Sequence, residues 1–137
     1  MDLPAKFTVL AYRMKIDKEY KRLKMDMSKK DIIEKLLNGD SIRGYKESGN
    51  SMTPIIKHQQ PVDIEPVDTS LLKRGDIVLV KVKGNIYTHK ITALRNGQVQ
   101  IGNNHGGING WTNLENVYGI VTAVDGREIG GAKKKVK

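Results

Sequence analysis

Apolar runs separated by turn residues fill the second half of the chain and constrain its fold more than any other feature. Ile77–Val82 is rich in β-branched residues, and Lys83-Gly84-Asn85 connects it to a second apolar run over residues 86–94. Asn96-Gly97 is a strong hairpin signal, with residues 98–101 as the returning strand. We therefore expect a mainly β fold.

Further strands are expected on both sides of this region. Val62–Glu65 alternates apolar and acidic residues, and Val117–Val124 is a final apolar run interrupted by Gly119. Residues 103–111 are rich in glycine and amides, so we expect them to form a tight loop or a surface that recognises a partner. Trp111 is the expected packing anchor of that loop.

The first forty residues favour helices instead. A weak apolar stripe among basic side chains consists of Leu10, Met14 and Leu23. A second helix is better marked, because Ser28 and Asp31 can form a capping box and Asn38-Gly39 supplies a stop. Its apolar face consists of Ile32, Ile33, Leu36 and Leu37. The chain accordingly divides into a basic helical segment (residues 1–40), a β domain (residues 41–125) and a basic disordered tail (residues 126–137).

The net charge of +9 gathers at the two ends of the chain. Lysine and arginine outnumber acidic residues in residues 1–46 and 126–137, whereas residues 47–125 carry equal numbers of both. Basic ends attract polyanions such as nucleic acid, although charged ends also serve simply to keep a small domain soluble. The charge pattern alone leaves both interpretations open.

Composition also bears on the compartment. The chain has no cysteine, which excludes disulfides and thiolate metal sites. The apolar stretch at residues 7–12 is too short to span a bilayer. His58, His89 and His105 lack a spacing typical of metal sites. We expect a soluble cytoplasmic protein with no membrane span, metal or cofactor.

Gly49-Asn50-Ser51-Met52-Thr53-Pro54 is the segment with the clearest potential for chemistry. A serine beside a glycine, on a loop stiffened by proline, can present its hydroxyl together with adjacent backbone N–H groups. Ser51 would then be the nucleophile, and Gly49, Asn50 and Met52 would shape the oxyanion loop. Taken alone, the same string is ordinary turn chemistry.

The order of several motifs makes the catalytic interpretation more specific. After Ser51-Met52-Thr53-Pro54 come a short strand, Gly75-Asp76 with an aliphatic run, the segment Tyr87-Thr88-His89-Lys90-Ile91, and Gly102-Asn103-Asn104. This order resembles the catalytic domain of LexA-like and signal-peptidase-like serine proteases. The resemblance implies a bent, largely antiparallel β fold in which separate segments bring the nucleophile and the base together.

The resemblance also implies a general base. LexA-like proteins and bacterial signal peptidases carry a lysine on the corresponding strand, whereas archaeal and endoplasmic-reticulum signal peptidases have histidine followed by a basic residue. His89-Lys90 is similar to the second pattern. A neutral imidazole accepts a hydroxyl proton near neutral pH, whereas an amine must first be desolvated. His89 is therefore the expected base and Lys90 the alternative, since a strand directs adjacent side chains to opposite faces.

The chain departs from the family pattern at three places. Gln59-Gln60 stands where the family usually has Gly-Asp, and Gly49 stands where many bacterial signal peptidases have a hydroxyl that assists the oxyanion. Asn103, followed by Asn104, stands where the closing motif has an aspartate. An amide at the place of the carboxylate cannot stabilise an imidazolium by charge, so we expect slow turnover.

Two functions of different classes follow. The first is a soluble serine peptidase that cleaves an extended peptide or protein substrate with a Ser51–His89 dyad. The second is a weak or inactive module of the same fold that binds nucleic acid or a protein partner through its basic ends and amide-rich loop. The substrate and the oligomeric state stay open.

Overall fold

The computed structural model describes residues 29–129. The chain divides into two units between Glu34 and Lys35, and the fold below is that of the second unit. Residues 29–37 are helical, and the helix ends at Asn38-Gly39 as the sequence predicts. Leu36 is buried, but Leu37, predicted on the same apolar face, is 67% exposed. Ser28, the earlier helix and residues 130–137 lie outside the described residues.

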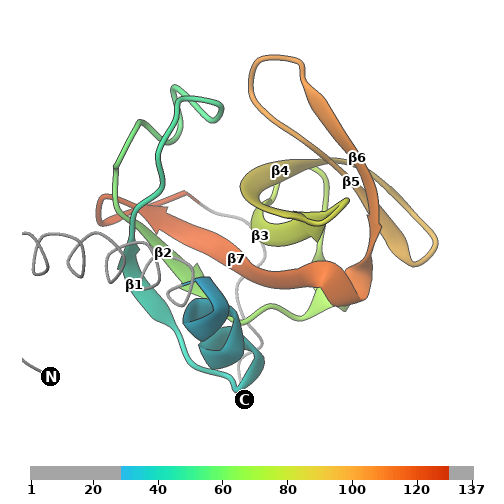
Figure 1. The fold of residues 1–137 in the computed structure, drawn as a ribbon, viewed down its shortest axis with the longest axis horizontal. Helices are drawn as coiled ribbons and strands as arrows, with labels where there is room; N and C mark the ends of the chain where they lie inside the picture. Colours follow the sequence, from blue (N-terminus) through green and yellow to red (C-terminus); the bar gives the residue numbers. More distant parts are fainter. Residues whose placement is uncertain (1–28, 130–137) are drawn as a thin grey trace, which may run out of the picture. The chain divides into compact units, whose positions relative to one another are not determined.

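A single antiparallel sheet forms most of the domain (Figure 1). Its strands are β1 (Ile42–Tyr45), β2 (Val62–Glu65), β3 (Ile77–Val82), β4 (Asn85–Arg95), β5 (Gln98–Gly102), β6 (Ile108–Asn113), β7 (Val117–Val124) and β8 (Arg127–Glu128). The short 3₁₀ helices are η1 (Thr69–Leu71) and η2 (Leu114–Asn116). The spatial order is β1-β2-β7-β3-β4-β5-β6, with β8 beside β7. The expectation of a mainly β, largely antiparallel fold is confirmed.

The core forms where the apolar runs of the sequence meet. β3 has five of its six residues buried because it pairs with β4 on one side and β7 on the other. Removal of these aliphatic side chains from water is the main stabilising contribution. The core cluster consists of Leu72, Val78, Val80, Val82, Ile91, Val99, Ile101, Val117 and Ile120.

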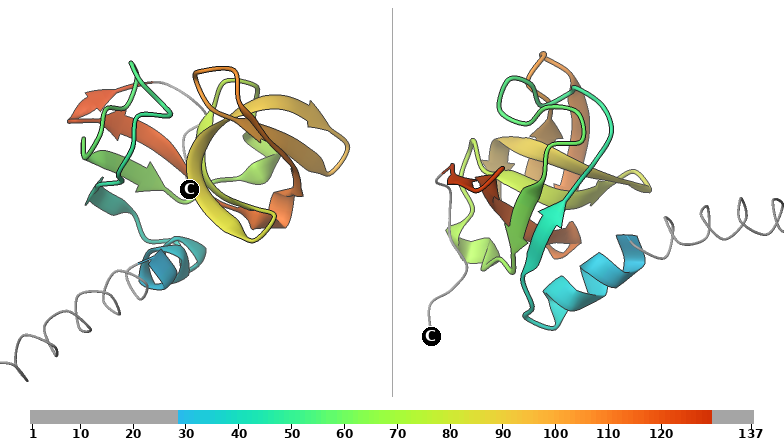
Figure 2. Two further views of the ribbon diagram at one scale, coloured as in Figure 1. Left: turned by 45° about the horizontal axis from the view of Figure 1, so that its top comes forward. Right: turned by 90° about the vertical axis from the view of Figure 1, so that its left-hand side faces the viewer.

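β4 is the element that positions the base. Its first half pairs with β3 and its second half with β5, and the register shifts between Ile91 and Ala93. A bulge of this kind bends a strand and increases its twist. Figure 2 shows β4 curling around the core as a result. His89 lies in the first half, opposite Val78 of β3.

Polar contacts hold β1 against β2, near the entry to the nucleophile loop. The Ser41 hydroxyl donates to the carboxylate of Glu65, which Arg43 also contacts at 3.0 Å. Asp63 accepts a hydrogen bond from the Gly44 backbone N–H at 3.1 Å. These contacts position the point at which the chain leaves β1 towards Ser51.

Close packing explains the glycine within β7. A Cβ added at Gly119 would lie 2.7 Å from Ile64 Cγ2 and 3.0 Å from both Glu65 O and Leu36 Cδ1. Only glycine allows β2, β7 and Leu36 to approach this closely, so Gly119 does not interrupt the strand.

Two boundaries differ from the sequence prediction. Ile108–Asn113 is strand β6, so the predicted loop is limited to residues 103–107 and Trp111 lies within a strand, with the Arg95 guanidinium 4.0 Å from its ring centroid. The sheet also extends beyond residue 125, because Asp125-Gly126 turns the chain into β8. The tail predicted from residue 126 was therefore placed too early.

Candidate active site

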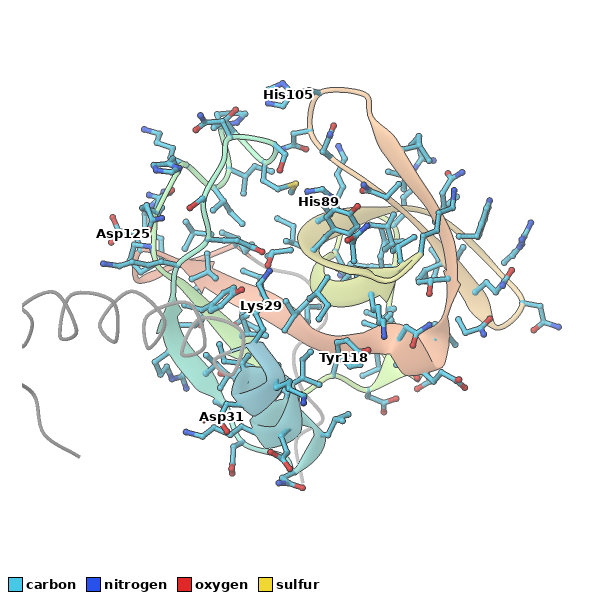
Figure 3. The ribbon with its side chains drawn as sticks, viewed as in Figure 1. Lys29, Asp31, His89, His105, Tyr118 and Asp125 are labelled. Carbon is cyan, nitrogen blue, oxygen red and sulfur yellow. The ribbon has the colours of Figure 1, made fainter. Side chains whose placement is uncertain are left out.

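Ser51 and His89 lie within hydrogen-bonding distance, although 38 positions separate them in the sequence. Ser51 Oγ is 3.0 Å from His89 Nε2. Ser51 is half-buried on the loop between β1 and β2, and His89 is 8% exposed on β4. Figure 3 shows His89 below the two loops that cover this side of the domain. The hydroxyl of Ser51 thus meets His89, which the sequence favoured as the base over Lys90.

A third residue, Asn109 of β6, completes the arrangement. Asn109 Oδ1 is 2.7 Å from His89 Nδ1. Because an amide oxygen only accepts hydrogen bonds, Nδ1 carries the proton and Nε2 is left with the lone pair that can accept from Ser51. His89 therefore has the tautomer that a general base requires.

The sequence assigned this third position to Asn103, and that assignment is wrong. Asn103 Oδ1 accepts hydrogen bonds from the backbone N–H groups of His105 at 2.8 Å and Gly107 at 2.9 Å. Its side chain therefore shapes the tight turn between β5 and β6. Asn109 would have been predicted near the site if residues 108–113 had been recognised as a strand that pairs with β5.

An aromatic contact also restrains the imidazole. Tyr87 precedes His89 by two residues on β4, so the two side chains share a face. Their rings stack with centroids 4.7 Å apart and an interplanar angle of 20°. Ring stacking and the hydrogen bond that His89 Nδ1–H donates to Asn109 Oδ1 together fix the plane in which His89 faces Ser51.

The oxyanion loop is shaped by backbone contacts. Gly49 has φ of 107°, a conformation that favours glycine, and its N–H donates to His58 Nδ1 at 2.8 Å. The Asn50 carbonyl accepts from both the N–H (3.2 Å) and the hydroxyl (2.9 Å) of Thr53. Met52 is buried and the Thr53–Pro54 peptide bond is cis. The Gly49 N–H is thus engaged with His58 and is not available to an oxyanion.

The loop at residues 103–107 contacts the nucleophile loop directly. Asn104 donates from its backbone N–H to Ser51 O at 2.9 Å and from its side chain to Met52 O at 3.1 Å. His105 Nε2 lies 3.0 Å from Asn50 O. These contacts tie the loop that carries Ser51 to the hairpin that carries Asn109.

Gln59 shows how the chain accommodates one departure from the family pattern. Its φ is 61°, in the left-handed region where the resembled family usually has glycine. The Gln59 side chain donates to Ser48 Oγ at 2.9 Å, and its backbone N–H donates to Glu47 O at 3.0 Å. The loop therefore keeps a turn that glycine would form with less strain.

We expect Gln59→Gly to stabilise the domain. The substitution removes the strain of a side chain at a left-handed φ, which stabilises the folded state. It also removes one exposed hydrogen bond and gives the unfolded chain more conformational freedom, and both of these effects are destabilising. The first effect is the larger, so the free energy of unfolding should increase by about 0.5–1 kcal/mol. Urea unfolding measures the difference. Gln60→Gly is the matched control and should not stabilise, since Gln60 does not have a positive φ. Equal effects of the two substitutions would contradict this account.

Within residues 29–129, no cluster of three or more histidine, cysteine or acidic side chains is arranged to hold a metal. His58 and His105 are both exposed: His58 lies on the nucleophile loop and accepts from the Gly49 N–H, and His105 contacts that loop at Thr53. No helix in the described residues combines the length and apolarity needed to cross a membrane.

No protein-family model matches the chain, and a search of curated proteins found no matching sequence.

Proposed function

We propose that this chain is a serine peptidase that uses Ser51 as the nucleophile and His89 as the general base. The observation that carries the proposal is the hydrogen-bonded series Ser51 Oγ–His89 Nε2 and His89 Nδ1–Asn109 Oδ1, with distances of 3.0 and 2.7 Å. A hydroxyl, an imidazole in the basic tautomer and an orienting group are the elements of activated nucleophilic catalysis.

The arrangement supports a two-stage reaction. Ser51 Oγ attacks the scissile carbonyl carbon while its proton passes to His89 Nε2, and the resulting imidazolium then protonates the leaving amine. A water molecule, deprotonated by the same imidazole, hydrolyses the acyl–Ser51 ester and restores the hydroxyl. We place the oxyanion of each tetrahedral intermediate beside the N–H of Ser51, since the Gly49 N–H is bound to His58.

The motif order favours a peptide as the substrate. Ser51, His89 and the hairpin after Gly102 occur in the order of LexA-like and signal-peptidase-like proteases. An extended substrate segment can add to an open sheet edge as a further strand, which suits this β domain.

Labelling with a fluorophosphonate probe tests the nucleophile. The wild-type chain should react at one serine, Ser51→Ala should not react, and intact mass should show a single adduct. Ser48→Ala, an exposed serine on the same loop, is the matched control and should label like wild type. Labelling that persists in Ser51→Ala, or a complete absence of labelling in wild type, would overturn the proposal.

The amide of Asn109 favours a second candidate, a catalytically weak or inactive module of the same fold with a regulatory role. A neutral amide orients His89 but contributes no negative charge to an imidazolium. Such a module would bind nucleic acid or a protein partner, with the basic residues at the two ends of the chain supplying charge. A salt-dependent gel shift with mixed nucleic acid that is equally strong in Ser51→Ala, together with an unreactive Ser51, would favour it.

A further inference from the structure

The loop between β5 and β6 supplies hydrogen bonds to three consecutive carbonyl groups of the nucleophile loop. The Asn104 backbone N–H donates to Ser51 O at 2.9 Å, and the Asn104 side-chain Nδ2 donates to Met52 O at 3.1 Å. The neighbouring His105 Nε2 lies 3.0 Å from Asn50 O, and this nitrogen carries a proton because a carbonyl oxygen only accepts. One short loop thus holds the nucleophile and the residues on either side of it.

A carbonyl that is fixed in direction also fixes the N–H group that follows it. A trans peptide unit is planar, so its C=O and N–H point in opposite directions. The bond to Ser51 O therefore directs the Met52 N–H away from Asn104, and the bond to Asn50 O directs the Ser51 N–H away from His105. Neither of these two N–H groups is hydrogen-bonded to another residue that the structure describes. The loop therefore sets the direction of the peptide units on both sides of the Ser51 Cα.

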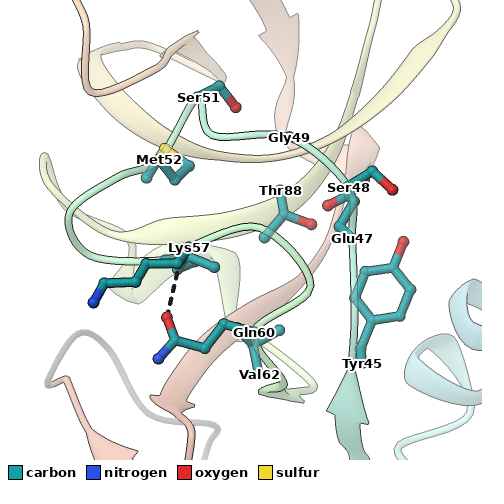
Figure 4. A pocket seen from close by; sticks show the side chains of 11 residues that line it. Tyr45, Glu47, Ser48, Gly49, Ser51, Met52, Lys57, Gln60, Val62 and Thr88 are labelled. Atoms are coloured by element: carbon teal, nitrogen blue, oxygen red, sulfur yellow. Dashed lines mark hydrogen bonds between the residues drawn. The ribbon is translucent and has the colours of Figure 1, made fainter.

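The nucleophile loop depends on such outside contacts. Residues 46–61 connect β1 to β2 without a helix or a strand, so no regular ladder of hydrogen bonds holds them. Ser51 and Met52 also border a cavity of about 30 Å³, whose other walls include Val62 and Thr88 (Figure 4). Atoms beside a cavity lose packing contacts on that side. The hydrogen bonds from the β5–β6 loop therefore contribute more to the position of Ser51 than they would in a closely packed loop.

The loop that carries Asn104 is itself held in shape by Asn103. Asn103 Oδ1 accepts from the backbone N–H groups of His105 and Gly107, and the Asn103 N–H donates to Gly107 O at 2.9 Å. A Cβ added at Gly107 would lie 2.7 Å from Asn103 Nδ2, so the asparagine side chain fits closely against a glycine. Asn104 therefore extends from a well-supported turn.

We infer that Asn104 is a positioning residue of the proposed peptidase, which holds the Ser51 and Met52 carbonyls so that the Ser51 hydroxyl faces His89. The inference rests on the proposed function and deepens it. Asn104 acts through the two carbonyls and not on the reacting atoms. Asn109 on the same hairpin orients His89, so one hairpin aligns the nucleophile and the base with each other. A misplacement of about 1 Å between reacting groups costs about 100-fold in rate.

Substitution of Asn104 by aspartate and by alanine tests the inference, with N-acetyl-Ala-Ala thiobenzyl ester as the substrate. Aspartate has the size and shape of asparagine, but its carboxylate cannot donate to Met52 O and repels that oxygen. We expect kcat to fall by about 10-fold to 100-fold in Asn104→Asp with KM unchanged, and by a smaller factor in Asn104→Ala. A side chain that only fills space would show the opposite order, because aspartate fills the same space and alanine does not.

Asn113→Ala is the matched control on the same hairpin. Asn113 Oδ1 accepts from Gln98 Nε2 at 3.0 Å, so this variant also loses one amide hydrogen bond, and it should keep the kcat of wild type. Urea unfolding of every variant verifies that the sheet is folded. If Asn104→Asp does not fold, Asn104→Ala decides: a lower kcat supports the inference and an unchanged kcat overturns it.

Fluorophosphonate labelling of Ser51 in wild type separates the two proposals. With Ser51 labelled, three results overturn the inference and leave the peptidase proposal standing. These are an unchanged kcat in folded Asn104 variants, a larger loss in Asn104→Ala than in Asn104→Asp, and an equal loss in Asn113→Ala. An unlabelled Ser51 with no Ser51-dependent hydrolysis overturns both proposals.

Discussion

Substitution of His89 by alanine should abolish most Ser51-dependent hydrolysis, whereas Lys90→Ala should retain most of it. Ser51 Oγ is hydrogen-bonded to His89 Nε2, and general-base assistance is worth about 100-fold to 10,000-fold in rate. His89 accepts the hydroxyl proton only as the neutral ring. Hydrolysis rates of an N-acetyl-dipeptide thiobenzyl ester by wild type and the two variants measure the effects.

Lys90→Ala is the internal control for this experiment, since it changes the neighbouring residue of the same strand. If Lys90 were the base, the effects of the two substitutions would be reversed. Equal activity of both variants and wild type would place the chemistry elsewhere in the molecule.

The parts of the fold that the sequence predicted are those with local signals. Lys83-Gly84 and Asn96-Gly97 occupy two-residue connections, and the apolar runs beside them form β3, β4 and β5. Turn type and strand propensity depend on neighbouring residues alone, so no knowledge of distant pairing was needed.

β6 lacked such a signal. Its sequence, Ile-Asn-Gly-Trp-Thr-Asn, contains amides and glycine rather than a β-branched run, and it is a strand because it pairs with β5. Gln100 lies opposite Trp111 and Ile101 lies opposite Gly110. Since this pairing brings Asn109 to His89, the misread strand and the wrong choice of Asn103 have one cause.

The small cavity that Ser51, Met52 and Thr88 help to line could not be predicted either. Thr88 belongs to an ordinary strand pattern, and nothing in that pattern indicates that its buried hydroxyl has no hydrogen-bond partner among the described residues. Whether a buried hydroxyl is paired depends on side chains from several segments, which only the folded arrangement reveals.

Asn109→Asp should increase turnover by about 10-fold to 100-fold. A carboxylate of the same shape can accept a hydrogen bond from His89 Nδ1–H, as Asn109 Oδ1 does at 2.7 Å. It also adds a negative charge that stabilises the imidazolium formed when Ser51 attacks. Loss of the aspartate in a Ser-His-Asp triad costs about 10,000-fold, partly because the wrong tautomer results. In this chain the amide oxygen already fixes the tautomer, so the gain from charge alone is smaller.

The pH dependence of Asn109→Asp provides a second readout. A nearby carboxylate favours protonated imidazole, so the rise of activity with pH should move to higher pH than in wild type. Asn103→Asp is the matched control, because its side chain bonds to backbone N–H groups of the loop and not to His89. It should leave both turnover and the pH dependence of wild type unchanged. A folded Asn109→Asp with wild-type turnover and an unshifted pH profile would show that Asn109 does not orient the base, and a gain in Asn103→Asp alone would restore the assignment made from sequence.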